Sequence, residues 1–124
     1  MIGSTRNVRV FAYTQPVDMR KGYSGLEGIV RNQIGKDLLE GDLFLFVAKN
    51  RLRAKVLLFD GSGICIFQKR MEKGHFARLR SEQGTITMTM TELSLFLEGS
   101  ELVGRRALSP PPLPLDDLAV GIGT

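Results

Sequence analysis

One stretch of the chain, residues 54–69, is decisive for the fold, and it reads AKVLLFDGSGICIFQK. Two mainly apolar runs, 54–59 and 64–69, lie on either side of the turn-forming residues DGSG at 60–63. Because Asp and Gly tolerate the positive φ angles of tight turns, the stretch predicts a β-hairpin. Both runs are apolar on both faces, which predicts two central strands that are covered on both sides, at least in part.

Further strands are predicted on either side of this hairpin. Residues 43–48 form a continuous apolar run, and the polar break at 49–53 has the length of a second hairpin loop. Residues 7–13 and 85–90 alternate between apolar and polar side chains, as half-buried strands do. In the second of these segments the threonines are expected to face outward, and the side chains expected to face inward are Ile86, Met88 and Met90.

Two helices are expected beside the sheet. Ser24 and Glu27 have the spacing of a capping box, and apolar residues then recur at helical spacing as far as Gly35, a natural helix end. Thr91 is expected to cap a second, short helix, which ends at Gly99 and buries Leu93, Phe96 and Leu97. The predicted class is α+β: a small, mostly antiparallel sheet built on a β-meander, with two packed helices.

The chain of 124 residues fits one domain, expected at residues 1–108. Residues 109–114 read SPPPLP, which forms neither a helix nor a central strand. Residues 109–124 are therefore expected to be a disordered tail, either inert or serving as a docking peptide. No apolar run approaches the roughly 20 residues of a membrane helix, and the N-terminus has no apolar signal core. A cytoplasmic protein without membrane contact is expected.

Positive charge is concentrated in residues 49–80. This segment holds only two acidic residues, Asp60 and Glu72, although the whole chain has a net charge of only +4. Such a concentration indicates either a polyanionic partner, with nucleic acid the first candidate, or a solvated sheet edge guarded by cations. The basic residues of the segment are Lys49, Arg51, Arg53, Lys55, Lys69, Arg70, Lys73, Arg78 and Arg80.

The hairpin loop at 49–53 is the best candidate for DNA contact. Lys49, Arg51 and Arg53 alternate, so in an extended segment they share a face that Lys55 continues. A two-stranded ribbon fits the major groove, where loop cations reach phosphates. The candidate track is extended by Lys69, Arg70, Lys73, Arg78 and Arg80.

Arg20 and Lys21 have two possible roles. They immediately precede the first predicted helix, whose N-terminus favours anions, so they are candidates to hold a backbone phosphate. Alternatively, Arg20 forms a salt bridge with Asp18 that stiffens the loop.

No constellation of catalytic residues is predicted. Metal-dependent strand cleavage needs converging carboxylates, and the only set to consider is Asp18, Asp42 and Asp60, the last two of which occupy ordinary turn positions. His75 is the only histidine, and the single cysteine, Cys65, lies in an apolar run and is expected to be a buried small hydrophobe. A protein without catalytic residues, metal or cofactor is therefore expected.

Three segments, read together, are similar to one family. The first, residues 16–26, reads PVDMRKGYSGL, the second, 41–46, reads GDLFLF, and the third extends from 55 to 76. Their order and spacing resemble the TnpB accessory proteins of IS-sixty-six family insertion sequences, over roughly residues 8–100. The motif residues are Asp18, Met19, Arg20, Lys21, Gly22, Asp60, Gly61 and Gly63. That family usually has tryptophan near Phe59 and just after Phe76, whereas this chain has none.

The resemblance implies a role in transposition beside a separate, larger transposase, and it supplies no active site. Two functions remain open on this basis: an accessory factor that binds DNA, and an adaptor that binds the transposase without DNA contact of its own. Salt-dependent binding to duplex DNA distinguishes them. The sequence does not determine the oligomeric state.

Overall fold

The computed structural model describes residues 8–99. The predicted tail at 109–124 and the first residue of the strand predicted at 7–13 lie outside this range. None of the helices within it is long and apolar enough to span a membrane.

The described part of the chain contains five strands, β1 (Val10–Tyr13), β2 (Leu43–Val47), β3 (Arg53–Phe59), β4 (Ile64–Arg70) and β5 (Thr85–Met88). They form one sheet in the order β4-β3-β2-β1-β5. β1 and β2 pair in parallel, because the long connection between them crosses over the sheet, and all other neighbours pair antiparallel. The α+β class and the meander of β2, β3 and β4 are confirmed, in a sheet that is mixed.

The prediction that both strands of the 54–69 hairpin are central is wrong for β4, which lies at an edge of the sheet. Phe67 in the middle of β4 is 51% exposed, whereas Leu57 of β3 is fully buried. An apolar run shows that a strand has two apolar faces, but it does not show how many neighbours the strand has. The two hairpin turns themselves are confirmed.

The first helical segment begins earlier than predicted. Helix α1 (Tyr23–Ile29) has Gly22 as its N-cap, with no side-chain hydrogen bond, so the predicted capping box of Ser24 and Glu27 is wrong. Ser24 lies within the first turn, where its backbone is already helical. The segment continues as a π-helical turn (Val30–Ile34), which ends at Gly35 with φ 77° as predicted, and a short 3₁₀ turn (Leu38–Glu40) follows.

The second helix, α2 (Met90–Leu97), is capped by Thr89 and not by Thr91. Thr89 Oγ1 accepts from Glu92 N at 3.1 Å, and the Glu92 carboxylate accepts from Thr89 N at 2.9 Å, which completes a capping box. Met90 is 45% exposed at the start of α2, so its predicted inward position is wrong, whereas Met88 is buried as expected.

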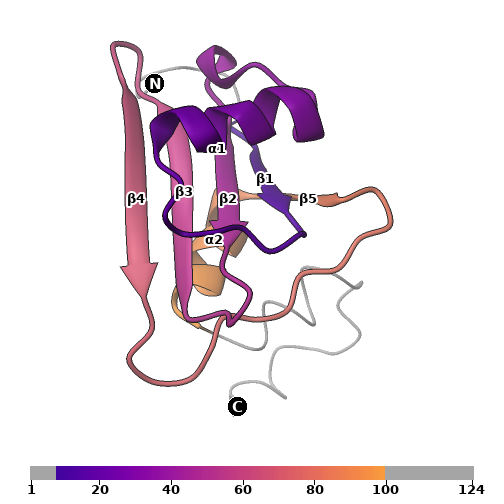
Figure 1. Cartoon of the computed structure of the whole chain (residues 1–124), viewed down its shortest axis with the longest axis vertical. Coiled ribbons are helices and arrows are strands. Elements are labelled where there is room, and N and C mark those ends of the chain that lie inside the picture. Colours follow the sequence, from indigo (N-terminus) through magenta and orange to yellow (C-terminus); the bar gives the residue numbers. More distant parts are fainter. Residues whose placement is uncertain (1–7, 100–124) are drawn as a thin grey trace.

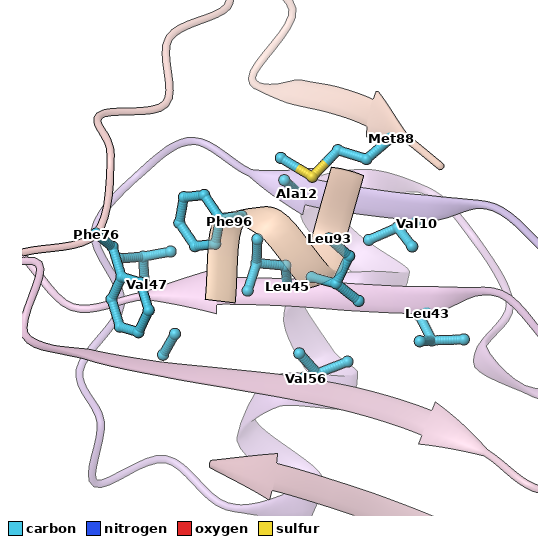
Figure 2. Packing of buried hydrophobic residues seen from close by; sticks show 11 residues of the cluster. Val10, Ala12, Leu43, Leu45, Val47, Val56, Phe76, Met88, Leu93 and Phe96 are labelled. Carbon is cyan, nitrogen blue, oxygen red and sulfur yellow. The ribbon is translucent and has the colours of Figure 1, made fainter. Parts of the chain in front are cut away.

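The two helices cover opposite faces of the sheet, with α1 in front and α2 behind in Figure 1. Leu26 and Val30 pack on one face against Phe44 and Phe46. On the other face, α2 packs its buried side chains against β1, β2 and β5 (Figure 2). β2 is therefore buried on both faces, which explains why its five residues are all apolar.

Candidate nucleic-acid interface

The loop between β2 and β3, residues 48–52, is held in an uncommon conformation at Arg51. Arg51 has φ 58°, in the left-handed region that residues other than glycine rarely adopt. Its Nη1 donates to the Phe76 carbonyl at 2.8 Å, and Phe76 N donates to the Arg51 carbonyl at 2.8 Å. These two hydrogen bonds hold the segment after β4 against the loop.

A basic pocket forms where these two segments meet. Its volume is about 130 Å³, and the start of the connection after β1 completes its wall. No acidic side chain lines it, and four basic residues do: Lys49, Arg51, Arg78 and Arg80. Arg78 and Arg80 are exposed and follow Phe76 closely in the chain. The pocket therefore concentrates positive charge without internal neutralisation.

A second, larger pocket lies on the other side of the same loop and has mixed charge. Its volume is about 490 Å³. Arg20 Nη2 lies 2.7 Å from Asp18 Oδ2, and Arg70 Nε lies 2.9 Å from Glu72 Oε2, so two of its three lining arginines are paired, and the third is Arg53. Hydrogen bonds from the Arg20 side chain and backbone lower the pKa of Asp18 from 3.8 to about 2. Of the two roles considered for Arg20, the salt bridge is the one observed.

Not all of the predicted basic track is free at the surface. The expectation that Lys55 continues an exposed face is wrong: it is 7% exposed, and its Nζ donates to the Lys21 carbonyl at 2.7 Å. Lys69 Nζ donates to the Leu97 carbonyl at the end of α2, at 2.6 Å. Arg51 is likewise not a free tip residue, because it binds Phe76. The candidates with exposed side chains are Arg20, Lys21, Lys49, Arg53, Arg70, Lys73, Arg78 and Arg80.

Lys55 and Val17 position the motif loop that precedes α1. Val17 N donates to the Val47 carbonyl at 3.0 Å, and Lys55 reaches the Lys21 carbonyl from β3. The loop, with Asp18 and Met19, is thereby fixed beside the 48–52 loop. This explains why one pocket is lined both by the motif and by the hairpin.

The three aspartates considered for metal binding serve separate structural contacts. Asp42 is 2% exposed and forms an ion pair with Arg9 at 3.2 Å. Asp60 Oδ1 accepts from the backbone N–H groups of Ser62 and Gly63, and these bonds lower the pKa of Asp60 to about 2. Within residues 8–99, no group of three His, Cys, Asp or Glu side chains is arranged to hold a metal.

The remaining candidate residues, Cys65 and His75, lie apart from the basic pocket. Cys65 is only partly buried, not fully as predicted, and burial together with the Asp60 carboxylate raises the pKa of its thiol. His75 is exposed beside the segment that closes the pocket, and it does not line it.

Thr14 is a pocket residue that the sequence patterns did not reveal. Its Oγ1 is buried and has no hydrogen-bond partner among the described residues. No local signal marks it, because its position depends on how β1 pairs with its neighbours. A buried hydroxyl without a partner costs stability.

Thr14→Val is therefore expected to raise the free energy of unfolding by about 1 kcal/mol, since valine keeps the branched shape without the hydroxyl. Urea unfolding followed by circular dichroism measures this. Thr87→Val, at an exposed position of β5, is the control and should change stability by less than about 0.5 kcal/mol. A loss of stability in Thr14→Val would show that the hydroxyl has a partner in solution.

Comparison with known proteins places this chain in a family. The family model described as IS66 Orf2 like protein matches residues 8–107. The uncharacterized protein y4jC of Sinorhizobium fredii is 37% identical over 99 residues, which cover 80% of this chain and 85% of that protein. The uncharacterized protein y4hO of the same organism is 36% identical over 99 residues, covering 80% and 86%. No solved structure matches the chain. The chain thus belongs to the IS66 Orf2-like family, the accessory proteins of insertion-sequence transposition.

Proposed function

We propose that this accessory protein binds DNA during transposition through the hairpin-loop end of its sheet, beside the element-encoded transposase. The observation that supports this most directly is the basic pocket, in which four cations lie together and no acidic side chain lines the wall. Arg53, the first residue of β3, adds a further exposed positive charge next to the same loop. Cations arranged without acidic neighbours attract phosphates, and their binding to DNA releases counterions.

We further propose that the protein does not itself cut or join DNA strands. Asp18 and Asp60, two of the carboxylates considered for a metal site, accept hydrogen bonds from their own loops, and Asp42 is buried beside Arg9. Strand cleavage through metal ions needs carboxylates that converge on one point. Reproducible magnesium-dependent nicking of DNA by the purified protein would contradict this part of the proposal.

The DNA-binding proposal is tested with two exposed residues of the β2–β3 hairpin, Lys49 in the loop and Arg53 at the start of β3, which do not take part in the hydrogen bonds between Arg51 and Phe76. In Lys49→Gln/Arg53→Gln, duplex affinity should fall, and the slope of log K against log salt should flatten by about 2 units, near 0.9 for each phosphate that is no longer neutralised. Fluorescence anisotropy of a labelled duplex at several salt concentrations measures both.

The matched control is Arg31→Gln/Lys36→Gln, which removes the same charge from the segment before the start of β2, at the opposite end of that strand. Its salt slope should stay near that of the wild type. If the wild type binds no duplex in a salt-dependent way, or if both variants weaken binding equally, the proposed interface is wrong.

An adaptor function is the second candidate, and the β4 edge favours it. β4 has seven residues and pairs only with β3 among the described elements, and its Phe67 is half exposed. An open strand edge of this length is a template for pairing with a strand of another protein, here the transposase. Transposase binding by a protein without any salt-dependent DNA affinity would favour this function.

A further inference from the structure

We infer that the basic pocket binds the terminal phosphate of a DNA strand, so that the protein recognises strand ends in preference to continuous duplex. The inference rests on the proposed DNA binding and gives it a specific ligand. It starts from the size of the pocket, about 130 Å³. A single water needs only roughly 10–15 Å³ of such space, so the pocket has room for a small oxyanion. The four basic lining residues make a phosphate the oxyanion that fits this pocket best.

The charge of the pocket favours a terminal phosphate over an internal one. A phosphate monoester carries a charge of roughly −1.5 to −2 at pH 7, whereas a phosphodiester within a strand carries about −1. Lys49, Arg51, Arg78 and Arg80 surround the cavity, and no carboxylate among the lining residues competes for them. The second pocket is different, because Asp18 and Glu72 pair with two of its three arginines, Arg20 and Arg70. The basic pocket therefore binds the additional negative charge of a terminal phosphate more favourably than the second pocket does.

Arg51 is held in place for such a ligand. Its Nη1 is used by the Phe76 carbonyl, and no other hydrogen bond of its guanidinium occurs within residues 8–99. Nε and Nη2, the two remaining positions, can donate side by side to two phosphate oxygens. Because the Arg51 side chain is already held in one position before the ligand binds, binding costs less conformational entropy. The left-handed backbone of Arg51 is a strained conformation of the kind that functional sites retain.

The experiment compares two blunt duplexes of the same sequence, one with 5′-phosphate ends and one with 5′-hydroxyl ends. The wild-type chain is expected to bind the phosphorylated duplex about tenfold more tightly, as hydrogen bonds to a charged group allow. In Arg78→Gln/Arg80→Gln this preference should fall to about twofold or less, because half of the pocket cations are gone. Both side chains are exposed, so the variant should fold, which circular dichroism checks.

Arg31→Gln/Lys36→Gln, with the same loss of charge outside the pocket, should keep the tenfold preference. A titration with inorganic phosphate, followed by amide NMR shifts of residues 77–80, provides a second readout that needs no DNA.

The outcomes separate this inference from the proposed function. Equal binding of both duplexes by the wild type would overturn the terminal-phosphate site and leave DNA binding intact. Binding of inorganic phosphate that depends on Arg78 and Arg80, without any duplex binding, would support the site and overturn the DNA function. Loss of the preference in the control variant as well would show that overall charge, and not the pocket, recognises the end.

Discussion

Phe76→Ala is expected to lower the free energy of unfolding by about 3–5 kcal/mol, the usual cost of emptying a buried phenylalanine site. Phe76 is fully buried although it lies in a segment without regular secondary structure. Its ring stacks on Phe96 of α2, with 5.2 Å between centroids and 9° between planes. Figure 2 shows the two rings beside Val47. By packing in the core, the Phe76 ring therefore holds the segment that follows β4 against the rest of the domain.

The loss of stability is measured by urea unfolding of the full chain, with Phe67→Ala as the matched control. Phe67 is 51% exposed at the sheet edge, so its truncation should cost much less, about 1 kcal/mol. A double-mutant cycle with Phe96→Ala should show coupling of about 0.5–1.5 kcal/mol, as stacked aromatic pairs do. A loss below about 1 kcal/mol in Phe76→Ala would mean that this connection is not part of the core.

Arg51→Ala is expected to cost about 1–3 kcal/mol, because the partly buried Phe76 carbonyl loses its charged donor while the strained backbone remains. Arg51→Gly loses the same hydrogen bond, but glycine adopts φ 58° without the steric cost of a Cβ atom. Arg51→Gly should therefore be about 1 kcal/mol more stable than Arg51→Ala. The expected order of stability is wild type, then the glycine variant, then the alanine variant.

Chemical denaturation of the three proteins decides this order. If the alanine variant is as stable as the wild type, the Arg51 side chain does not hold the loop. If the glycine variant is the less stable of the two, the backbone is not strained at this position. Both results also concern the basic pocket, because Arg51 lines it and is hydrogen-bonded to Phe76, which precedes the other wall of the pocket in the chain. This is also why the DNA-binding test changes Lys49 and Arg53 and leaves Arg51 in place.

Several local features were predictable from the sequence. The turn at residues 60–63 forms as predicted, because Asp60 accepts hydrogen bonds from groups only two and three residues away. Gly35 and Gly99 end their helical segments with φ 77° and 82° for the same local reason. The salt bridge between Asp18 and Arg20 also joins near neighbours in the chain, and it was one of the two roles considered.

Helix starts were less predictable, because several residues compete for each cap. Ser24 has the correct spacing from Glu27, yet the helix begins before it, at Tyr23. Thr89 and Thr91 are both possible caps by residue type, and the hydrogen bonds with Glu92 select Thr89. Residue type alone does not distinguish between neighbouring candidates, since the cap is the residue at which the backbone first turns helical, and the preceding strand or loop decides where that is.

The order of the strands and the basic pocket were decided only by the tertiary structure. Lys55 has the spacing of an exposed cation, but the sheet buries it under the loop that contains Lys21, 34 residues away. Arg51 meets Phe76 across 25 residues, and this contact, together with the hydrogen bond from Met71 N to the Leu52 carbonyl, brings Arg78 and Arg80 to the hairpin loop. A sequence pattern describes one segment at a time, and the strands, the turns and the surplus of positive charge of this protein could be predicted at that level. Which segments become neighbours depends on how the whole core closes, and that closure determined which cations are buried and which surround a pocket.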